Sequence, residues 1–331
     1  MGSKSKLFSG ETSSIMPTYA SRLYAGPADL EALTHLISTR PPARQDDFPA
    51  LADLQEMMGV ADVCAHTRVW EDAAGHVAGM TILETDEDGA RLIFEVSPEA
   101  AAEGLGAQML IWAVDCLRRA APEEPVAQVS ISCAEDDAMR RALLQEHGFS
   151  CQPEHTLRLA RSLAEPIPDA QFPVGFSLRH GVGADEAEAW VALHRAAFGT
   201  EHMTVEYRRA MIDAPSYDPE LDLVAVAPDG TFAAYCAASI SDEENEISGR
   251  RDGFTDPVAT HPAYQRRGLS RALLLTALRL LRERGMDTAR LGTSSENVAM
   301  QRAARAVGYR VKGRTFFFTL FLGHVAAFRK V

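Results

Sequence analysis

The chain has 331 residues, of which 46% are hydrophobic and 24% charged, and its formal net charge is −13 at pH 7. This length accommodates two domains with ordinary hydrophobic cores. The negative charge argues against broad nucleic-acid binding, which depends on Lys and Arg side chains that neutralise phosphates. The sequence also lacks an apolar run of the roughly 20 residues needed to span a bilayer. We therefore expect a protein without nucleic-acid or membrane partners, and its oligomeric state stays open.

The cysteines and the N-terminus indicate where the protein works. The five cysteines are odd in number and include no CxxC pair or zinc-like spacing. We therefore expect free thiols in a reducing cytoplasm and no metal site. Residues 1–16 are rich in Ser, Gly and Lys and lack the apolar core of a signal peptide. They are expected to form a disordered tail, either native or left over from cloning, on a cytoplasmic protein.

The two halves of the chain show the same succession of predicted elements. Each begins with a short strand (residues 21–24 and 176–179) and a helix (27–38 and 185–198), followed by a hairpin. Each continues with a strand, a glycine turn, an amphipathic helix, another strand and another helix. Both series end in a glycine followed by an aromatic residue, at Gly148-Phe149 and Gly308-Tyr309. The agreement of so many elements in one order indicates two homologous domains.

The boundary between these domains is predicted in residues 164–173, where three prolines interrupt a stretch without helical or strand periodicity. We accordingly assign residues 17–165 to an N-terminal domain and residues 172–331 to a C-terminal domain.

The most informative stretch is the glycine turn of the second half. A predicted strand (253–260) precedes it, and an amphipathic helix (270–284) follows. A strand, a short turn and a helix direct several backbone N–H groups into one concavity at the positive end of the helix dipole, which suits a phosphate group. The residues of this turn are Gln265, Arg266, Arg267, Gly268, Leu269, Ser270 and Arg271.

The turn of the first half keeps its glycines but differs in charge. Ala101 stands where the second half has Gln265, and Glu99 and Glu103 place negative charge where phosphates would lie. We expect this copy to be degenerate, although Glu95 on its preceding strand could in principle act as a base.

The spacing Gln265-x-x-Gly268-x-Ser270, with Asn297 placed eleven residues before Gly308, resembles the GNAT (Gcn5-related) N-acetyltransferase superfamily. The resemblance implies an α/β (α+β) fold of two tandem GNAT-type domains, each a mixed, largely antiparallel sheet flanked by helices. Ser270 departs modestly from the Gly or Ala of the family motif.

The resemblance also implies acetyl-CoA as the acyl donor. The amides of residues 266–271 would bind the diphosphate of the coenzyme, and Asn297 would hydrogen-bond near its pantetheine arm. The pantetheine arm would pair with the strand residues Val258, Ala259 and Thr260.

The sequence offers several candidate catalytic groups. The family often places a glutamate on the fourth strand, at the position of Phe254 in this chain. Asp256 lies two residues further on and, in an unbroken strand, points to the same face. We propose Asp256 as the base or as a group that orients the amine; alternatively, it satisfies backbone groups beside Pro257. Asp252 and His261 are further candidates.

The tyrosine with which many relatives protonate the leaving sulfur has no counterpart, because the matching position is Ala304. The predicted function is an acetyl-CoA-dependent N-acetyltransferase that moves an acetyl group to a primary amine of a small molecule or peptide by direct attack on the thioester. One alternative is a non-catalytic acyl-CoA-binding or regulatory module. Another is a nucleotide-binding protein, although the chain lacks a Walker lysine pattern.

Overall fold

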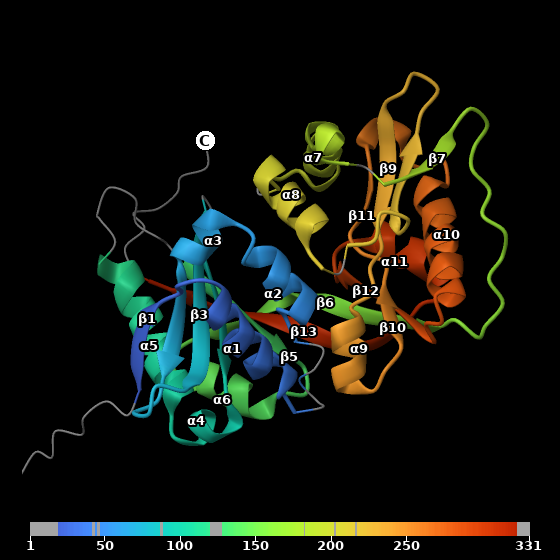
Figure 1. The fold of residues 1–331 in the computed structure, drawn as a ribbon. Helices are drawn as coiled ribbons and strands as arrows, with labels where there is room; N and C mark the ends of the chain where they lie inside the picture. Colours follow the sequence, from blue (N-terminus) through green and yellow to red (C-terminus); the bar gives the residue numbers. More distant parts are fainter. Residues whose placement is uncertain are drawn as a thin grey trace, which may run out of the picture.

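Figure 1 shows the computed structural model, which describes residues 19–322 except 42, 43, 45, 46, 87, 88, 120–127, 182, 202 and 216. The tail expected at residues 1–16 lies outside the described residues. We call residues 19–162 the N-terminal half and residues 177–322 the C-terminal half.

The elements of the N-terminal half are β1 (Ala20–Leu23), α1 (Pro27–Ser38), α2 (Leu51–Met57), α3 (Ala61–Ala65), β2 (Thr67–Glu71), β3 (Val77–Asp86), β4 (Gly89–Val96), α4 (Pro98–Ala102), α5 (Leu105–Arg119), β5 (Gln128–Ala134), α6 (Ala138–Glu146) and β6 (Ser150–Ser162). Those of the C-terminal half are β7 (Ser177–His180), η2 (Ala184–Glu186), α7 (Ala187–Phe198), α8 (Val205–Asp213), β8 (Asp222–Val226), β9 (Phe232–Ala237), α9 (Asp242–Ser248), β10 (Asp252–Phe254), β11 (Val258–Thr260), η3 (Pro262–Tyr264), α10 (Leu269–Glu283), β12 (Thr288–Ser294), α11 (Val298–Ala306) and β13 (Arg310–Phe321).

The strands form two sheets. The larger has the order β1-β2-β3-β4-β5-β13-β6-β12-β10, and the smaller has the order β11-β9-β8-β7. The β4–β5 and β10–β12 pairs are parallel, and the other pairs between the named strands are antiparallel. The predicted class of mixed, largely antiparallel sheets flanked by helices is therefore confirmed.

One feature of the larger sheet differs from the expectation of a separate sheet in each half. The last strand of the described residues, β13, lies between β5 and β6 of the N-terminal half, and β6 pairs with β12 of the C-terminal half. In Figure 1 β13 accordingly runs from the C-terminal half into the N-terminal half. The halves have thus exchanged their last strands, and one sheet continues through both.

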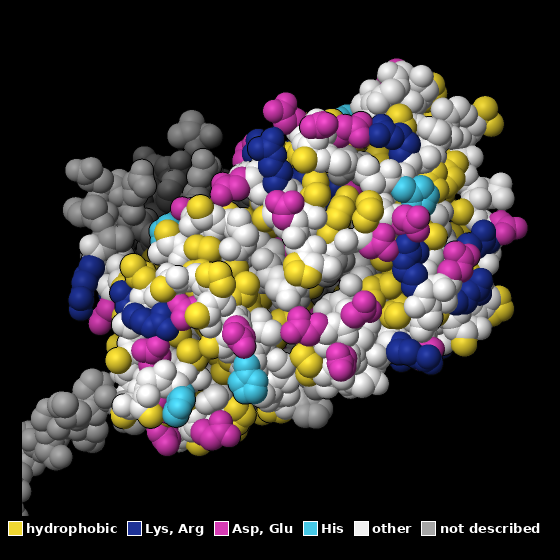
Figure 2. Space-filling model, in the orientation of Figure 1, with side chains coloured by type: hydrophobic (Ala, Val, Ile, Leu, Met, Phe, Trp, Pro, Cys, Tyr) yellow, Lys and Arg dark blue, Asp and Glu magenta, His cyan; other side chains and the backbone are white. Residues whose placement is uncertain are grey.

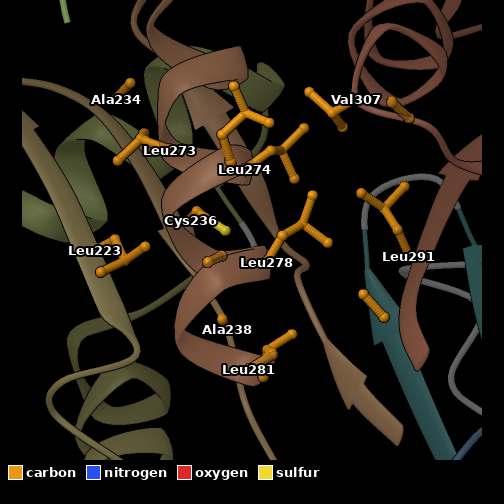
Figure 3. Close-up of a cluster of buried hydrophobic side chains, with 14 of the residues drawn as sticks. Leu223, Ala234, Cys236, Ala238, Leu273, Leu274, Leu278, Leu281, Leu291 and Val307 are labelled. Atoms are coloured by element: carbon orange, nitrogen blue, oxygen red, sulfur yellow. The ribbon is translucent and has the colours of Figure 1, made fainter. Parts of the chain in front are cut away.

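Helix α10 shows how the sequence builds the core of the C-terminal half. Its apolar residues recur on one face, where Leu273, Leu274 and Leu278 are completely buried. Figure 3 shows this face packed between the smaller sheet, represented by Leu223, and Leu291 of the larger sheet. The helix therefore holds the two sheets of this half together.

Helix α8 joins the two halves on a second surface. Ala210 belongs to the core of the N-terminal half, and Tyr207 packs against that core. The backbone N–H of Ala61 donates to Glu206 Oε1 at 3.2 Å. Gly59 is required here, because a Cβ atom at this position would lie 2.9 Å from the Cβ of Ala210.

The five cysteines are unpaired in the structure. On the face shown in Figure 2, acidic and basic side chains are interspersed without a broad basic area. In the described part of the chain, no helix combines the length and the apolar character needed to cross a bilayer.

Candidate active site

The site begins where the strand predicted at residues 253–260 divides. That prediction of one continuous strand is wrong: β10 pairs with β12 in the larger sheet, and β11 pairs with β9 in the smaller sheet. Between them, Pro257 lacks an N–H group for a sheet ladder, and the carboxylate of Asp256 accepts the N–H of Gly292 from β12 at 3.1 Å. We call the opening between β11 and β12 the C-terminal fork.

Strand β11 presents free backbone groups to this fork. The carbonyl of Pro257 accepts from Ala237, and the N–H of His261 donates to Ala233, so these residues face β9. Because backbone groups alternate along an antiparallel strand, those of Ala259 also face β9, whereas those of Val258 and Thr260 point toward the fork. Val258 and Thr260 thus have backbone groups that could pair with a pantetheine arm. The backbone groups of Ala259, the third residue expected to do so, face β9 instead.

The turn after β11 provides a concavity of amide groups. Arg266 (φ 62°) and Gly268 (φ 84°) both adopt left-handed conformations. Helix α10 then starts with the hydrogen bond from Ala272 N–H to the Gly268 carbonyl at 3.0 Å. Within the described residues, no amide of residues 266–271 donates to another group of the protein. Such a series of unbonded N–H groups at a helix N-terminus suits an anion.

The side chains of the turn have distinct roles. The hydroxyl of Ser270 lies 2.7 Å from that of Thr260, so it ties the first turn of α10 to β11. The guanidinium of Arg267 lies over the ring of Tyr264, at 5.5 Å. Leu269 is buried in the core and offers only its backbone. Gln265, Arg266 and Arg271 are exposed around the mouth of the turn.

Asn297 lies at the N-terminus of α11, where its Oδ1 accepts the N–H of Met300 at 3.0 Å. It is therefore a helix cap, and its exposed amide group keeps its N–H₂ donors. Asp137 caps α6 in the same way through Arg140 N–H, which agrees with the internal repeat.

Asp256 lies at the root of the fork. Its Oδ2 accepts from Gly292, while its Oδ1 is buried and has no hydrogen-bond partner among the described residues. Burial raises the pKa of Asp256 to about 7; the Gly292 N–H opposes this rise, and the charge of Asp53 adds to it. The carboxyl can therefore gain and lose a proton near neutral pH.

The other catalytic candidates are engaged elsewhere. Asp252 forms an ion pair with Arg290 at 2.5 Å, and the ring of His261 accepts from the N–H of Ala263 at the start of η3. Ala304 is completely buried in the core. Among these positions, Asp256 alone combines the fork with an unpartnered oxygen.

Helix α2 of the N-terminal half also approaches this region, since the charge of Asp53 acts on Asp256, and sequence reasoning missed it. Burial and the charge of Asp53 raise the pKa of Glu56 on α2 to about 8. Burial followed by the charges of Glu56 and Asp53 raises the pKa of Tyr207 on α8 as well. These groups are brought together by the contact between α2 and α8. No local pattern could predict this, because the residues lie about 150 positions apart in the sequence.

A known family model matches most of the C-terminal half. Residues 187–309 match the model of the Acetyltransferase (GNAT) family, from α7 through Tyr309. Residues 187–309 thus form a GNAT acetyltransferase domain, which makes the protein an acyltransferase.

Two curated relatives carry the name mycothiol acetyltransferase. The chain is 27% identical to mycothiol acetyltransferase of Segniliparus rotundus over 72% of this chain and 89% of the relative. It is 35% identical to mycothiol acetyltransferase of Kineococcus radiotolerans, over 43% of this chain and 45% of the relative.

Two solved structures share the fold. A GCN5-related N-acetyltransferase from Sphaerobacter thermophilus has a TM-score of 0.64 at 23% identity, over 93% of this chain and 96% of that structure. A tandem GNAT protein from the clavulanic acid biosynthesis pathway has a TM-score of 0.65 at 16% identity, over 93% and 99%. The tandem arrangement expected from the sequence thus has a counterpart among solved structures.

Proposed function

We propose that this GNAT protein transfers an acetyl group from acetyl-CoA to a primary amine of a small molecule or peptide. The observation that carries the proposal is the continuity of the C-terminal fork with the turn of unbonded amides. The free edge of β11 leads through the short turn η3 into residues 266–271. An extended arm with amide groups can add to such an edge as a further strand, while its diphosphate reaches the turn.

The residues present fit acetyl-CoA at both ends. The amides of residues 266–271 would hold the diphosphate, with Arg266 and Arg271 adding exposed positive charge at the mouth of the turn. Val258 and Thr260 would hydrogen-bond the pantetheine arm. Acetyl-CoA supplies the acetyl group as a thioester, which an uncharged amine attacks directly.

Asp256 would take the proton of the acceptor. An alkylamine with a pKa of about 10.4 is neutral in only about one molecule in 2,500 at pH 7. A carboxyl with a pKa of about 7 at the root of the fork can accept that proton through its unpartnered Oδ1. Because Ala304 stands where many relatives have a tyrosine acid, the CoA thiolate would leave without being protonated by the protein. The ordinary thiol pKa of about 8.5 permits this.

The proposal is tested by calorimetry with acetyl-CoA, followed by measurement of released CoA with a panel of amines. The name of the curated relatives makes mycothiol-type compounds the first acceptors to try. We expect binding of acetyl-CoA, no comparable binding of ATP or NAD, and turnover with at least one amine. Absence of binding would contradict the proposed site, and tight binding without turnover on any amine would favour a non-catalytic acyl-CoA-binding module.

A further inference from the structure

The N-terminal half contains a second fork of the same design. Strands β4 and β5 pair in parallel at Ala90–Val129 and Arg91–Ser130 and then separate. A turn at Gly104 (φ 89°) follows and leads into α5. By the reasoning applied to the C-terminal half, this N-terminal fork is where a second coenzyme would bind.

Two amides of this second turn are already used. Helix α4 occupies the place of the single turn η3, and at its C-terminal end Glu103 N–H donates to the Glu99 carbonyl and Gly104 N–H to the Ala101 carbonyl. The matching amides, those of Arg267 and Gly268, have no acceptor in the described chain. The carboxylates of Glu99 and Glu103 would moreover repel a diphosphate.

The opening of the N-terminal fork is filled by Arg140 from the first turn of α6. Its guanidinium donates to the backbone carbonyl of Phe94 on β4 and stacks on the Phe94 ring at 4.0 Å. Arg140 is only 9% exposed. The residue in the same place on α11, three positions after the capping Asn297, is the uncharged Met300. The C-terminal fork therefore lacks the group that closes the N-terminal one.

The carboxylate of this fork is neutralised as well. Glu95 is paired with Arg40 at 2.7 Å and with Arg44 at 3.0 Å. Burial alone would raise the pKa of Glu95, but the charges of Arg40, Arg44 and Arg140 outweigh it and hold the pKa below its usual range. Glu95, which the sequence left open as a base, is thus locked in its ionised form. Arg40 also donates to the carbonyls of Asp47 and Pro49, which fixes the segment that leads into α2.

We infer that the N-terminal half takes no coenzyme, because its own arginine side chains occupy the fork, and that the chain binds one acetyl-CoA per polypeptide. The inference rests on the proposed function of the C-terminal fork. The vacated site serves instead as a buried ion network that positions the segment leading into α2.

Two matched substitutions test coenzyme binding at the two forks separately. Gly268 and Gly104 have nearly the same positive φ, and a Cβ atom would meet nothing within 4 Å at either. Replacement by valine therefore strains both turns alike. Titration of the full chain with CoA by calorimetry should give one site for the natural chain and for Gly104→Val, with a Kd changed less than twofold. Gly268→Val should lose at least tenfold in affinity, while circular dichroism shows that it stays folded.

Two sites on the natural chain would overturn the inference. A full-affinity site that survives in Gly268→Val, or a tenfold loss of CoA affinity in folded Gly104→Val, would do the same. Absence of any heat with the natural chain would instead contradict the proposed function and would leave the N-terminal half without a coenzyme, as inferred. If either variant fails to fold, the stoichiometry of the natural chain still decides.

Discussion

Asp256 uses its two carboxylate oxygens differently. One oxygen holds the Gly292 N–H across the fork, which is the structural role that the sequence left open as an alternative. The other is buried without a partner among the described residues. A single residue therefore combines a fixed position with a proton-accepting atom, so the two interpretations of Asp256 do not exclude each other.

The substitution Asp256→Asn tests the proton-accepting role. The amide preserves size but cannot accept a proton, so we expect kcat to fall by about 10²-fold while the Kd for CoA stays within twofold. In the natural enzyme, kcat/KM should rise with pH through about 7, since the base acts when deprotonated. This rise should be absent in the variant.

The control is Asp252→Asn, which removes the ion pair with Arg290 and should preserve the shape of the pH profile. Unchanged turnover of Asp256→Asn at pH 7 would eliminate Asp256 as the base.

The raised pKa of Glu56 predicts how the free energy of unfolding depends on pH. Its pKa is about 8 in the folded protein and about 4.3 in an unfolded chain, so between these values the folded state holds a proton that the unfolded state has lost. The free energy of unfolding therefore decreases as pH rises from about 5 to 8. Glu56→Gln removes this decrease, and its melting temperature should exceed that of the natural chain by a few degrees more at pH 8 than at pH 5. Equal differences at the two pH values would contradict the shifted pKa.

At the scale of elements, the hydroxyl pair Thr260–Ser270 couples strand β11 to helix α10. Ser270→Ala removes one half-buried hydrogen bond, which should cost about 1 kcal/mol of unfolding free energy. Because the bond fixes the turn relative to the free edge of β11, the Kd for CoA should also rise by roughly three- to tenfold. Thr276→Ala, which removes a hydrogen bond further along α10, is the control and should leave the Kd unchanged.

The helices follow the sequence patterns more closely than the strands do. The helix predicted at residues 27–38 has these bounds in the structure, and α10 begins one residue before its prediction. Both are set by local signals, namely apolar periodicity and glycine or proline at the ends. The division between β10 and β11 was missed because alternation of side chains is the same in a continuous and a divided strand. Only the partners β9 and β12 distinguish the two.

At the scale of the whole molecule, the tandem repeat was readable from the sequence, but the exchange of β6 and β13 was not. The alternation of apolar residues along a strand indicates that one face is buried, but it does not indicate which strand lies beside it. The domain boundary predicted at residues 164–173 lies in the connection between β6 and β7, yet β6 lies beside β12. The domain limits thus stay a prediction of the sequence.

The shared sheet predicts a single cooperative unfolding transition. Loss of either half removes a partner strand from the other, so neither half keeps a complete sheet alone. Scanning calorimetry should give one transition whose calorimetric and van't Hoff enthalpies agree. Two transitions separated by about 10 °C or more would contradict this coupling. Addition of CoA should move the whole transition upward, even though the proposed site lies in one half.

The position of β13 also matters while the protein is being made. A polypeptide leaves the ribosome N-terminus first, and early domains ordinarily fold before later ones appear. Here the gap between β5 and β6 is filled by β13, which follows all the other described elements of the C-terminal half. The first half must therefore stay incompletely assembled until the C-terminal half has also been synthesised, and a ribosome that stalls before β13 would release neither half in its native form.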